Sequence, residues 1–150
     1  MRSLPVIAVI AAALVAAAPS GAAVKRLRAD MSGAREVSGG DANGTGTAKL
    51  RLNRARRRVC FDIRVHDIDQ VVAAHIHRGR RGVDGPIRVE LIGEPQGAED
   101  HFTGCAKGVS RRLIRRINRH PRRFYVNVHT VAFPGGAVRG QLHRPAAGIY

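Results

Sequence analysis

The chain has 150 residues, of which 44% are hydrophobic and only 4% aromatic, with no tryptophan. This length suits one domain with a substantial core and does not suggest two. The formal net charge of +15 comes mostly from arginines, which recur in groups such as Arg56-Arg57-Arg58 and Arg115-Arg116. Such a charge attracts polyanions of any kind, although a coding bias toward arginine would also produce it.

The first residues have the pattern of an export signal. Arg2 gives a positive start, residues 4–18 are small, apolar and uncharged, and residues 19–23 offer cleavage after Ala22 or Ala23. The apolar stretch is short for a membrane span, and no second long one follows. We therefore predict a signal peptide at 1–23 and one domain at 24–150, secreted or held in the periplasm or cell envelope without a transmembrane segment. An uncleaved anchor is the alternative, and the lack of a cysteine near the cleavage region argues against a lipid anchor.

Apolar and polar residues alternate over several short stretches, as in β-strands with one buried and one wet face. The alternation at 47–52 and 59–65, on either side of a polar turn at 53–57, predicts a hairpin. Turns rich in glycine and short polar residues, for example at 38–44, separate other stretches. Further strands are predicted at 26–34, 71–77, 86–92, 101–106, 124–131 and 137–143.

One segment, between residues 108 and 120, breaks the alternation. Ser110 can cap a short helix there, and Pro121 ends it. Leu113, Ile114 and Ile117 would form the apolar stripe of this helix. Short strands in regular succession with one short helix predict an all-β fold, a sandwich or a barrel.

Cys60 and Cys105 are the two cysteines of the chain, and an even pair in an exported domain is most simply a disulfide. Both lie on the polar phase of their predicted strands, so the bridge should lie on an outer face of the sheet. It would stabilise the fold by about 4 kcal/mol on a chain-entropy argument. Two free or metal-binding thiols are the alternative.

The motif His75-Ile76-His77 is the most informative in the chain. Residues two apart on a strand point to the same face, so the two imidazoles stand side by side, close enough to share a ligand. By the same period, Tyr125, Asn127 and His129 share a face, and so do Arg139, Gln141 and His143. If the last two strands form a hairpin beside the strand of His75, three imidazoles converge next to a polar row.

The pattern leaves two interpretations of this cluster open. His75, His77 and His129 with an open fourth position would suit Zn²⁺ or Cu²⁺, and a bound ion could activate water or cycle electrons. Alternatively, the row is a hydrogen-bond network on the wet face, in which Asn127 and Gln141 tie down backbone and imidazoles. The remaining histidines lie near turns or ends and are expected to be ordinary surface residues: His66, His101, His120 and His143.

Four blocks of the sequence together resemble the CHRD domain, a module named for chordin that also occurs in many secreted microbial proteins. They follow one another in the family's order and cover nearly all of the predicted domain. The resemblance implies an immunoglobulin-like antiparallel β-sandwich, in agreement with the predicted strands, and brings no established activity. The blocks are Ala74–Gly79, Gly82–Leu91, Tyr125–Thr130 and Phe133–Leu142.

A second similarity is more distant. Residues 73–77 resemble the copper-binding strand of copper/zinc superoxide dismutases, and residues 135–139 resemble the segment with their active-site arginine, one residue shorter. The resemblance implies His75 and His77 as copper ligands and Arg139 as an anion-attracting residue. The loop of histidines and aspartate that holds zinc in those enzymes has no convincing match here.

Other catalytic chemistry finds little support in the sequence. Ser110 has no candidate base at a meaningful spacing. The glycines around Gly79 and Gly82 do not lead from a strand into a helix, as a phosphate loop requires. Four carboxylates are scattered without a paired site: Glu36, Glu90, Glu94 and Asp100. We therefore expect no catalytic residues.

The basic helix, from Arg111 to Arg119, predicts salt-dependent and unspecific affinity for polyanions. Few aromatic residues are present to stack on bases, so a specific nucleic acid partner is not expected. Acidic envelope polymers or anionic lipid head groups suit an exported protein better. A solvated arginine-rich surface is the simpler interpretation.

These observations predict a secreted, non-catalytic binding or structural module, whose partner is an extracellular protein or an anionic envelope polymer. A copper- or zinc-binding protein with superoxide-dismutase-like chemistry is the alternative. A polyanion-binding envelope protein is the third hypothesis.

Overall fold

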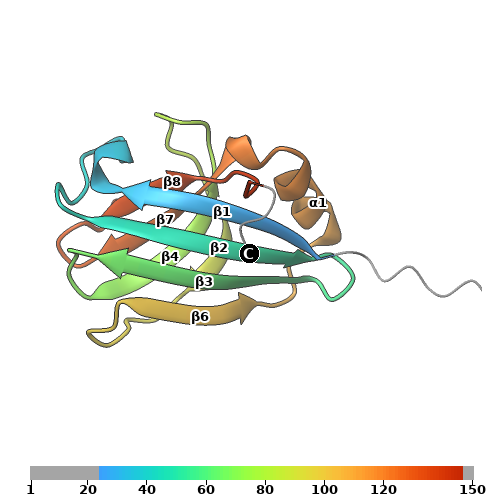
Figure 1. The fold of residues 1–150 in the computed structure, drawn as a ribbon, viewed down its shortest axis with the longest axis horizontal. Coiled ribbons are helices and arrows are strands. Elements are labelled where there is room, and N and C mark those ends of the chain that lie inside the picture. Colours follow the sequence, from blue (N-terminus) through green and yellow to red (C-terminus); the bar gives the residue numbers. More distant parts are fainter. Residues whose placement is uncertain (1–23, 147–150) are drawn as a thin grey trace, which may run out of the picture.

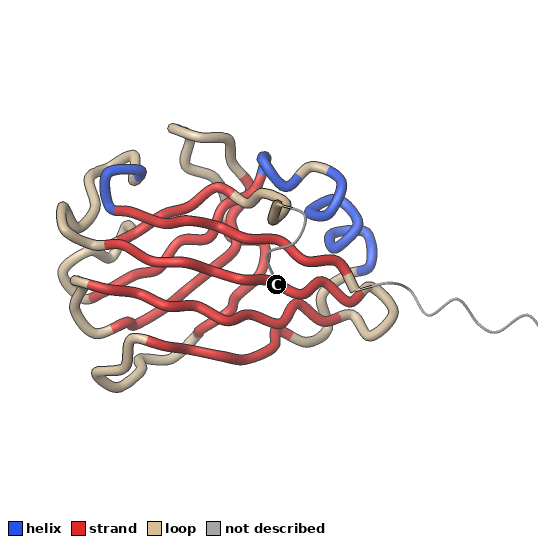
Figure 2. Tube along the Cα trace, in the orientation of Figure 1, coloured by secondary structure: helices blue, strands red, loops and turns tan. Residues whose placement is uncertain are grey.

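The computed structural model describes residues 24–146, so the predicted signal peptide at 1–23 lies outside the described residues. Strands make up most of the domain, and its helical segments lie at the two ends (Figure 2). The strands are β1 (Lys25–Ser32), β2 (Thr45–Asn53), β3 (Arg58–His66), β4 (Val71–Arg78), β5 (Ile87–Ile92), β6 (His101–Ala106), β7 (Phe124–Thr130) and β8 (Val138–Gln141). The helix α1 spans Arg111–Arg119, and short 3-10 turns lie at Gly33–Arg35 and Pro121–Arg123.

All eight strands belong to one antiparallel sheet, in the order β5-β4-β7-β8-β1-β2-β3-β6. The sheet curls so that β1, β2, β3 and β6 face β4 and β7 across the core (Figure 1). Its edge strands, β5 and β6, contact each other, so the barrel is nearly closed. The prediction of an all-β antiparallel fold with one short helix is confirmed. The two layers expected of a sandwich are two parts of this single continuous sheet.

The core follows from the alternation seen in the sequence. Leu50 and Leu52 of β2 and Ile63 of β3 point inward and are almost fully buried, and β4 and β7 supply Ile76 and Val126 from the opposite side. Ile114 and Ile117 of α1 close one end of this core. The predicted hairpin of β2 and β3, with one buried and one exposed face, is confirmed.

The disulfide prediction is also confirmed. Cys60 of β3 and Cys105 of β6 are directly opposite each other in the register, and their sulfurs are bonded. Both side chains lie on the outer face, since Phe61, next to Cys60, and Phe102, three positions before Cys105, point inward. The bridge therefore holds the edge strand β6 onto the sheet.

Some predicted element ends differ by a few residues. The first strand ends at Ser32, not at 34, because the chain turns at Gly33, where a Cβ would lie 1.7 Å from the carbonyl oxygen of Asp41. The last strand ends at Gln141, and His143 keeps only an isolated bridge to Arg28 of β1. Helix α1 begins after Ser110, whose side-chain oxygen accepts a hydrogen bond from the Leu113 N–H, as a capping serine does.

Candidate metal centre

The candidate centre lies on the outer face of β4, β7 and β8, away from the core. In the register, His75 is opposite Asn127, His77 is opposite Tyr125, and Asn127 is opposite Arg139. Opposite residues of antiparallel strands share a face, so these side chains form one polar array. The expectation that the last two strands pair, with the strand of His75 beside them, is confirmed.

This outer face is not wet, and the sequence-based expectation of a wet face was wrong at this point. Every residue of β7 is buried. Residues 79–85, residues 133–136 and the segment that carries Glu36 contribute contacts on the outside of the strands. The polar array is therefore enclosed between the sheet and three loops, where each unpartnered polar atom costs free energy.

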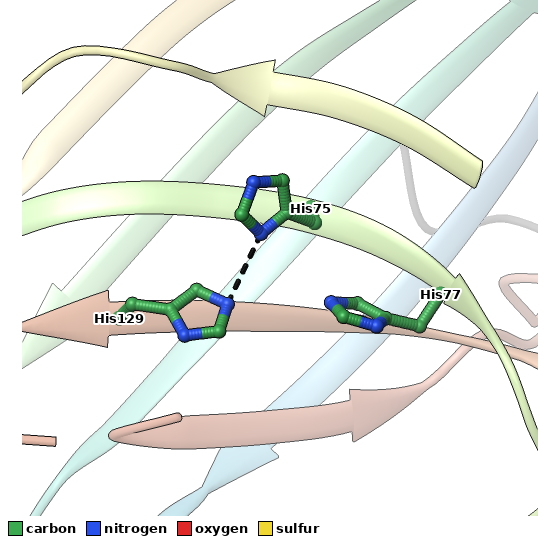
Figure 3. A group of neighbouring side chains, drawn as sticks. All are labelled: His75, His77 and His129. Atoms are coloured by element: carbon green, nitrogen blue, oxygen red, sulfur yellow. Dashed lines mark hydrogen bonds between the residues drawn. The ribbon is translucent and has the colours of Figure 1, made fainter. Parts of the chain in front are cut away.

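The three predicted histidines come together in this enclosure. His75 and His77 project from β4 and His129 from β7, and their rings gather at one place (Figure 3). One ring nitrogen from each residue lies within 4.8 Å of the other two. His77 and His129 are buried and His75 is half-buried. A shared ligand therefore needs only small movements of the rings.

Hydrogen bonds to backbone carbonyls fix the protonation of two rings. Nδ1 of His77 lies 2.8 Å from the Gly85 oxygen, and Nδ1 of His129 lies 2.9 Å from the Pro134 oxygen. A carbonyl only accepts, so both Nδ1 atoms carry the proton and both Nε2 atoms present a lone pair. Nδ1 of His75 lies 3.1 Å from Nε2 of His129 and donates to it. Nε2 of His77 is buried and has no partner among the described residues.

The surroundings keep all three imidazoles neutral. Burial lowers the pKa of His75 to about 4, and the neighbouring His129 and His77 add to this effect. Burial also lowers the pKa of His77 and of His129, against the opposing influence of their backbone carbonyl partners. Neutral imidazole is the form that binds metal ions. At neutral pH the cluster can bind a metal ion without net loss of a proton, because the proton of His75 can move from Nδ1 to Nε2 and free Nδ1 as a ligand.

Arg139 is buried in the same array, and its partners belong to the loop that covers the sheet. Its guanidinium donates to the Asp84 carboxylate at 2.8 Å and to the carbonyl oxygens of Arg80 and Val83 at 2.9 and 2.8 Å. The guanidinium carbon also lies 3.5 Å from the centre of the Tyr125 ring. Arg139 therefore fastens the loop 79–85 over the sheet. The anion that pairs with Arg139 in this structure is the carboxylate of Asp84, a residue of the same chain.

Asn127 and Gln141 hold the covering segments rather than the imidazoles. The Asn127 amide donates to both carboxylate oxygens of Glu36, at 3.1 and 3.2 Å. Burial raises the pKa of Glu36 to about 7, although the charge of Arg139 opposes the rise. The Gln141 amide donates to three backbone carbonyl oxygens, those of Gly79, Arg122 and Phe124. The expected tie to backbone thus holds for Gln141, whereas Asn127 bonds the Glu36 side chain, and neither amide forms a hydrogen bond with an imidazole among the described residues.

Sequence reasoning missed two members of the array, Glu36 and Asp84, and placed Tyr125 on the face of Asn127 and His129 without giving it a role. Glu36 had been grouped with the scattered carboxylates, and it reaches Asn127 from 91 positions earlier in the chain. Tyr125 stacks on His77 with ring centres 4.9 Å apart, and its hydroxyl accepts a hydrogen bond from the Gly85 N–H. The one usable signal in the sequence was the pair Gly135-Gly136, since glycine can mark a close approach. In the structure, a Cβ on Gly136 would lie 2.5 Å from a carboxylate oxygen of Glu36.

The remaining histidines lie outside the cluster. His66 and His120 are exposed, as expected of surface residues. His101 and His143 are partly exposed, and each lies 3.2 Å from a carboxylate, of Asp62 and of Asp30 respectively. No described helix is long and apolar enough to cross a membrane.

The fold and the site together define a barrel-like antiparallel β domain with an enclosed polar array on one outer face. The model of the CHRD domain family matches residues 27–142, and the chain belongs to this family. No curated protein and no solved structure matches the chain. The similarity to superoxide dismutases thus remains a resemblance of short segments.

Proposed function

We propose that this CHRD domain binds Cu²⁺ or Zn²⁺ through His75, His77 and His129. The observation that carries the proposal is the gathering of one ring nitrogen from each histidine within 4.8 Å. Imidazole nitrogen is a common ligand of both ions, and three protein ligands leave a further position for water or another molecule. The disulfide between Cys60 and Cys105 is consistent with action outside the cytoplasm.

The backbone partners of the imidazoles support a ligand role. Metal-binding histidines usually donate their second ring N–H to a carbonyl or carboxylate, which fixes the ring and its tautomer. His77 and His129 have such partners in Gly85 and Pro134. Both carbonyls belong to the loops that cover the sheet. The loops thus orient two lone pairs toward the centre of the cluster.

A purely structural role for the cluster explains fewer of the contacts. The hydrogen bond between His75 and His129 would join β4 to β7 without any metal. That interpretation leaves Nε2 of His77 buried and unpaired among the described residues, at a cost of about 1–3 kcal/mol. A metal ion would use this lone pair. Asn127 Oδ1 in the same array also lacks a partner among the described residues, but only the His77 nitrogen lies in the group of three imidazoles, and there it favours a ligand over a network.

The proposal covers binding and no catalytic step. Arg139 is held by Asp84 and two carbonyls, so superoxide-dismutase-like use of this arginine gains no support from the contacts. An extracellular binding or structural module that carries a metal ion is consistent with membership of the CHRD family. The ion would join β4 to β7 and hold the two covering loops against them.

The test is a titration of the purified exported protein, stripped of metal, with Cu²⁺ and separately with Zn²⁺, followed by calorimetry. We expect one ion per chain and at least tenfold weaker binding by His75→Ala and by His129→Ala. His66→Ala removes an exposed histidine at the end of β3 and should bind as the wild type does. Equal binding by all four proteins, or binding by none, would refute the proposal.

A further inference from the structure

Positive charge is concentrated at one end of the barrel, around α1. The sequence has no Asp or Glu from residue 101 to residue 150, and that stretch contains α1 with its five arginines. Carboxylates gather instead near residues 66–70 and 94–100, at the end of the barrel opposite α1 (Figure 1). The net charge of +15 is therefore distributed very unevenly.

A groove at the basic end combines arginines with an apolar floor. It runs between α1 and the strands β4 and β5 and is lined by Arg78, Arg88, Arg112 and Arg116, with Ile87 and Leu113 between them. The four arginines are exposed, and none of them forms an ion pair within residues 24–146. Ile87 is 52% exposed. The groove thus offers guanidinium groups and apolar surface together.

The arginine surface continues on both sides of α1. Arg112 also borders a second hollow, together with Arg54, Arg111 and Arg115. A third hollow, at the other end of the helix, is lined by Arg119, Arg122, Arg123 and Arg144. A charged surface that follows the helix on several sides suits a flexible, linear polymer better than a rigid partner with a flat surface.

We infer that the groove beside α1 binds an acidic polysaccharide outside the cell. Guanidinium groups pair with carboxylate and sulfate oxygens through two parallel hydrogen bonds. Sugar rings carry apolar C–H faces that would pack on Ile87 and Leu113. A polyphosphate chain has no such faces. Aromatic platforms for stacking bases are missing from the groove surface, because Phe124 is fully buried. Ile87 is the one large exposed hydrophobic residue that borders the groove, which gives little to insert into a bilayer.

Local charge decides the affinity, because salt screens distant charges. The Debye length is about 8 Å at physiological ionic strength, so arginines on other strands contribute little to a ligand in the groove. This permits a matched comparison between two pairs of basic residues. Arg112 and Arg116 line the groove, whereas Lys49 and Arg51 are exposed on the outer face of β2. Replacing either pair by glutamine lowers the net charge equally.

The experiment measures binding of the exported protein to heparin, an acidic polysaccharide, at several NaCl concentrations. We expect affinity to fall steeply with salt. Arg112→Gln/Arg116→Gln should weaken binding at least tenfold and reduce the slope of log Kd against log [NaCl] by about two. Lys49→Gln/Arg51→Gln should change the affinity less than twofold. Equal losses for the two pairs would overturn the inference, since the whole-chain charge would then explain the binding.

A second variant tests the choice of a sugar polymer. Ile87→Ser removes apolar surface and no charge, and it should weaken heparin binding while leaving binding to polyphosphate unchanged. Tighter binding to polyphosphate, to single-stranded DNA or to vesicles with anionic lipid than to heparin would contradict the inference. Circular dichroism of each variant establishes that it is folded, so a loss of affinity can be assigned to the groove.

Discussion

Two polar clusters share the outer face of β4, β7 and β8, and they differ in how the chain satisfies them. The guanidinium of Arg139 has three hydrogen-bond partners, all within the chain. The histidine cluster has one internal hydrogen bond and leaves Nε2 of His77 with no partner among the described residues. A buried charge that is paired within the chain stabilises the fold, whereas neutral bases with a free lone pair retain capacity for a ligand. The contacts of Arg139 are thus structural, and the histidine cluster is the candidate functional site.

The largest expected effect on stability lies outside both clusters. Cys60→Ser/Cys105→Ser opens a disulfide whose cysteines are 45 positions apart, and should lower the free energy of unfolding by about 4 kcal/mol. Urea unfolding measures this loss. The variant, while folded, should bind Zn²⁺ with the affinity of the wild type, because β3 and β6 contribute no ligand. A parallel loss of metal affinity would mean that affinity merely follows stability.

Replacement of Arg139 should disrupt the contacts of Arg139 with the loop 79–85 and leave the histidine cluster in place. Arg139→Met leaves two carbonyl oxygens and Asp84 without their donor, and should cost about 3 kcal/mol of stability. The midpoint of urea unfolding should fall with an unchanged m-value. Arg64→Met is a suitable control, since Arg64 is exposed and lies 3.9 Å from Asp62, and its replacement should cost less than about 0.5 kcal/mol. An equal cost for the two variants would remove the distinction between the clusters.

Replacement of His77 should lower metal affinity and leave stability almost unchanged. His77→Phe keeps a ring to stack on Tyr125 and removes both the unpaired Nε2 and the hydrogen bond to the Gly85 oxygen. The two effects oppose each other, so stability should change by less than about 1 kcal/mol. Metal affinity should fall at least tenfold, because the variant lacks one of the three proposed ligands. Calorimetry with Zn²⁺ and thermal unfolding of the same samples measure both quantities. A large loss of stability with unchanged affinity would assign His77 to the structural cluster.

The smallest expected effect concerns pH. Burial raises the pKa of Glu36 from 4.5 to about 7, so the folded state binds an additional proton between these pH values. The stability that this proton contributes is present below pH 4.5 and is lost as pH rises to 7. The pKa of His75 is lowered to about 4, so its contribution to stability is present above 6.5 and is lost as pH falls toward 4. Glu36→Gln should therefore make the metal-free protein gain stability more steeply between pH 5 and 7. Urea midpoints at several pH values test this, and an unchanged pH profile would count against the raised pKa.

Much of the fold follows from local alternation. The period of two in β2 and β3 predicts their pairing and their buried face, and it places Cys60 on the outside. The same period brings His75, His77 and His129 onto one face once β4 and β7 pair. The order of the strands depends on long-range packing, since β3 pairs with β6 and β1 with β8. No local pattern contains that information.

The enclosure of the polar array was beyond sequence reasoning for a related reason. Alternation shows which residues leave the core, but not whether loops then cover them. The covering contacts come from Asp84, Pro134 and Glu36, which lie in segments without periodicity. Burial keeps the imidazoles neutral, and carbonyl oxygens of the covering loops fix the tautomers of His77 and His129. The candidate ligands were thus predictable from the sequence, and their chemical state was not.

Nitrogen-15 NMR of the histidine side chains tests the central claim most directly. In the metal-free protein, His77 and His129 should be neutral with the proton on Nδ1, held by Gly85 and Pro134. Addition of one equivalent of Zn²⁺ should shift Nε2 of both residues and Nδ1 of His75, and leave the rings of His66 and His120 unchanged. Unchanged resonances of His75, His77 and His129, or equal shifts for the exposed histidines, would contradict a metal centre at this site.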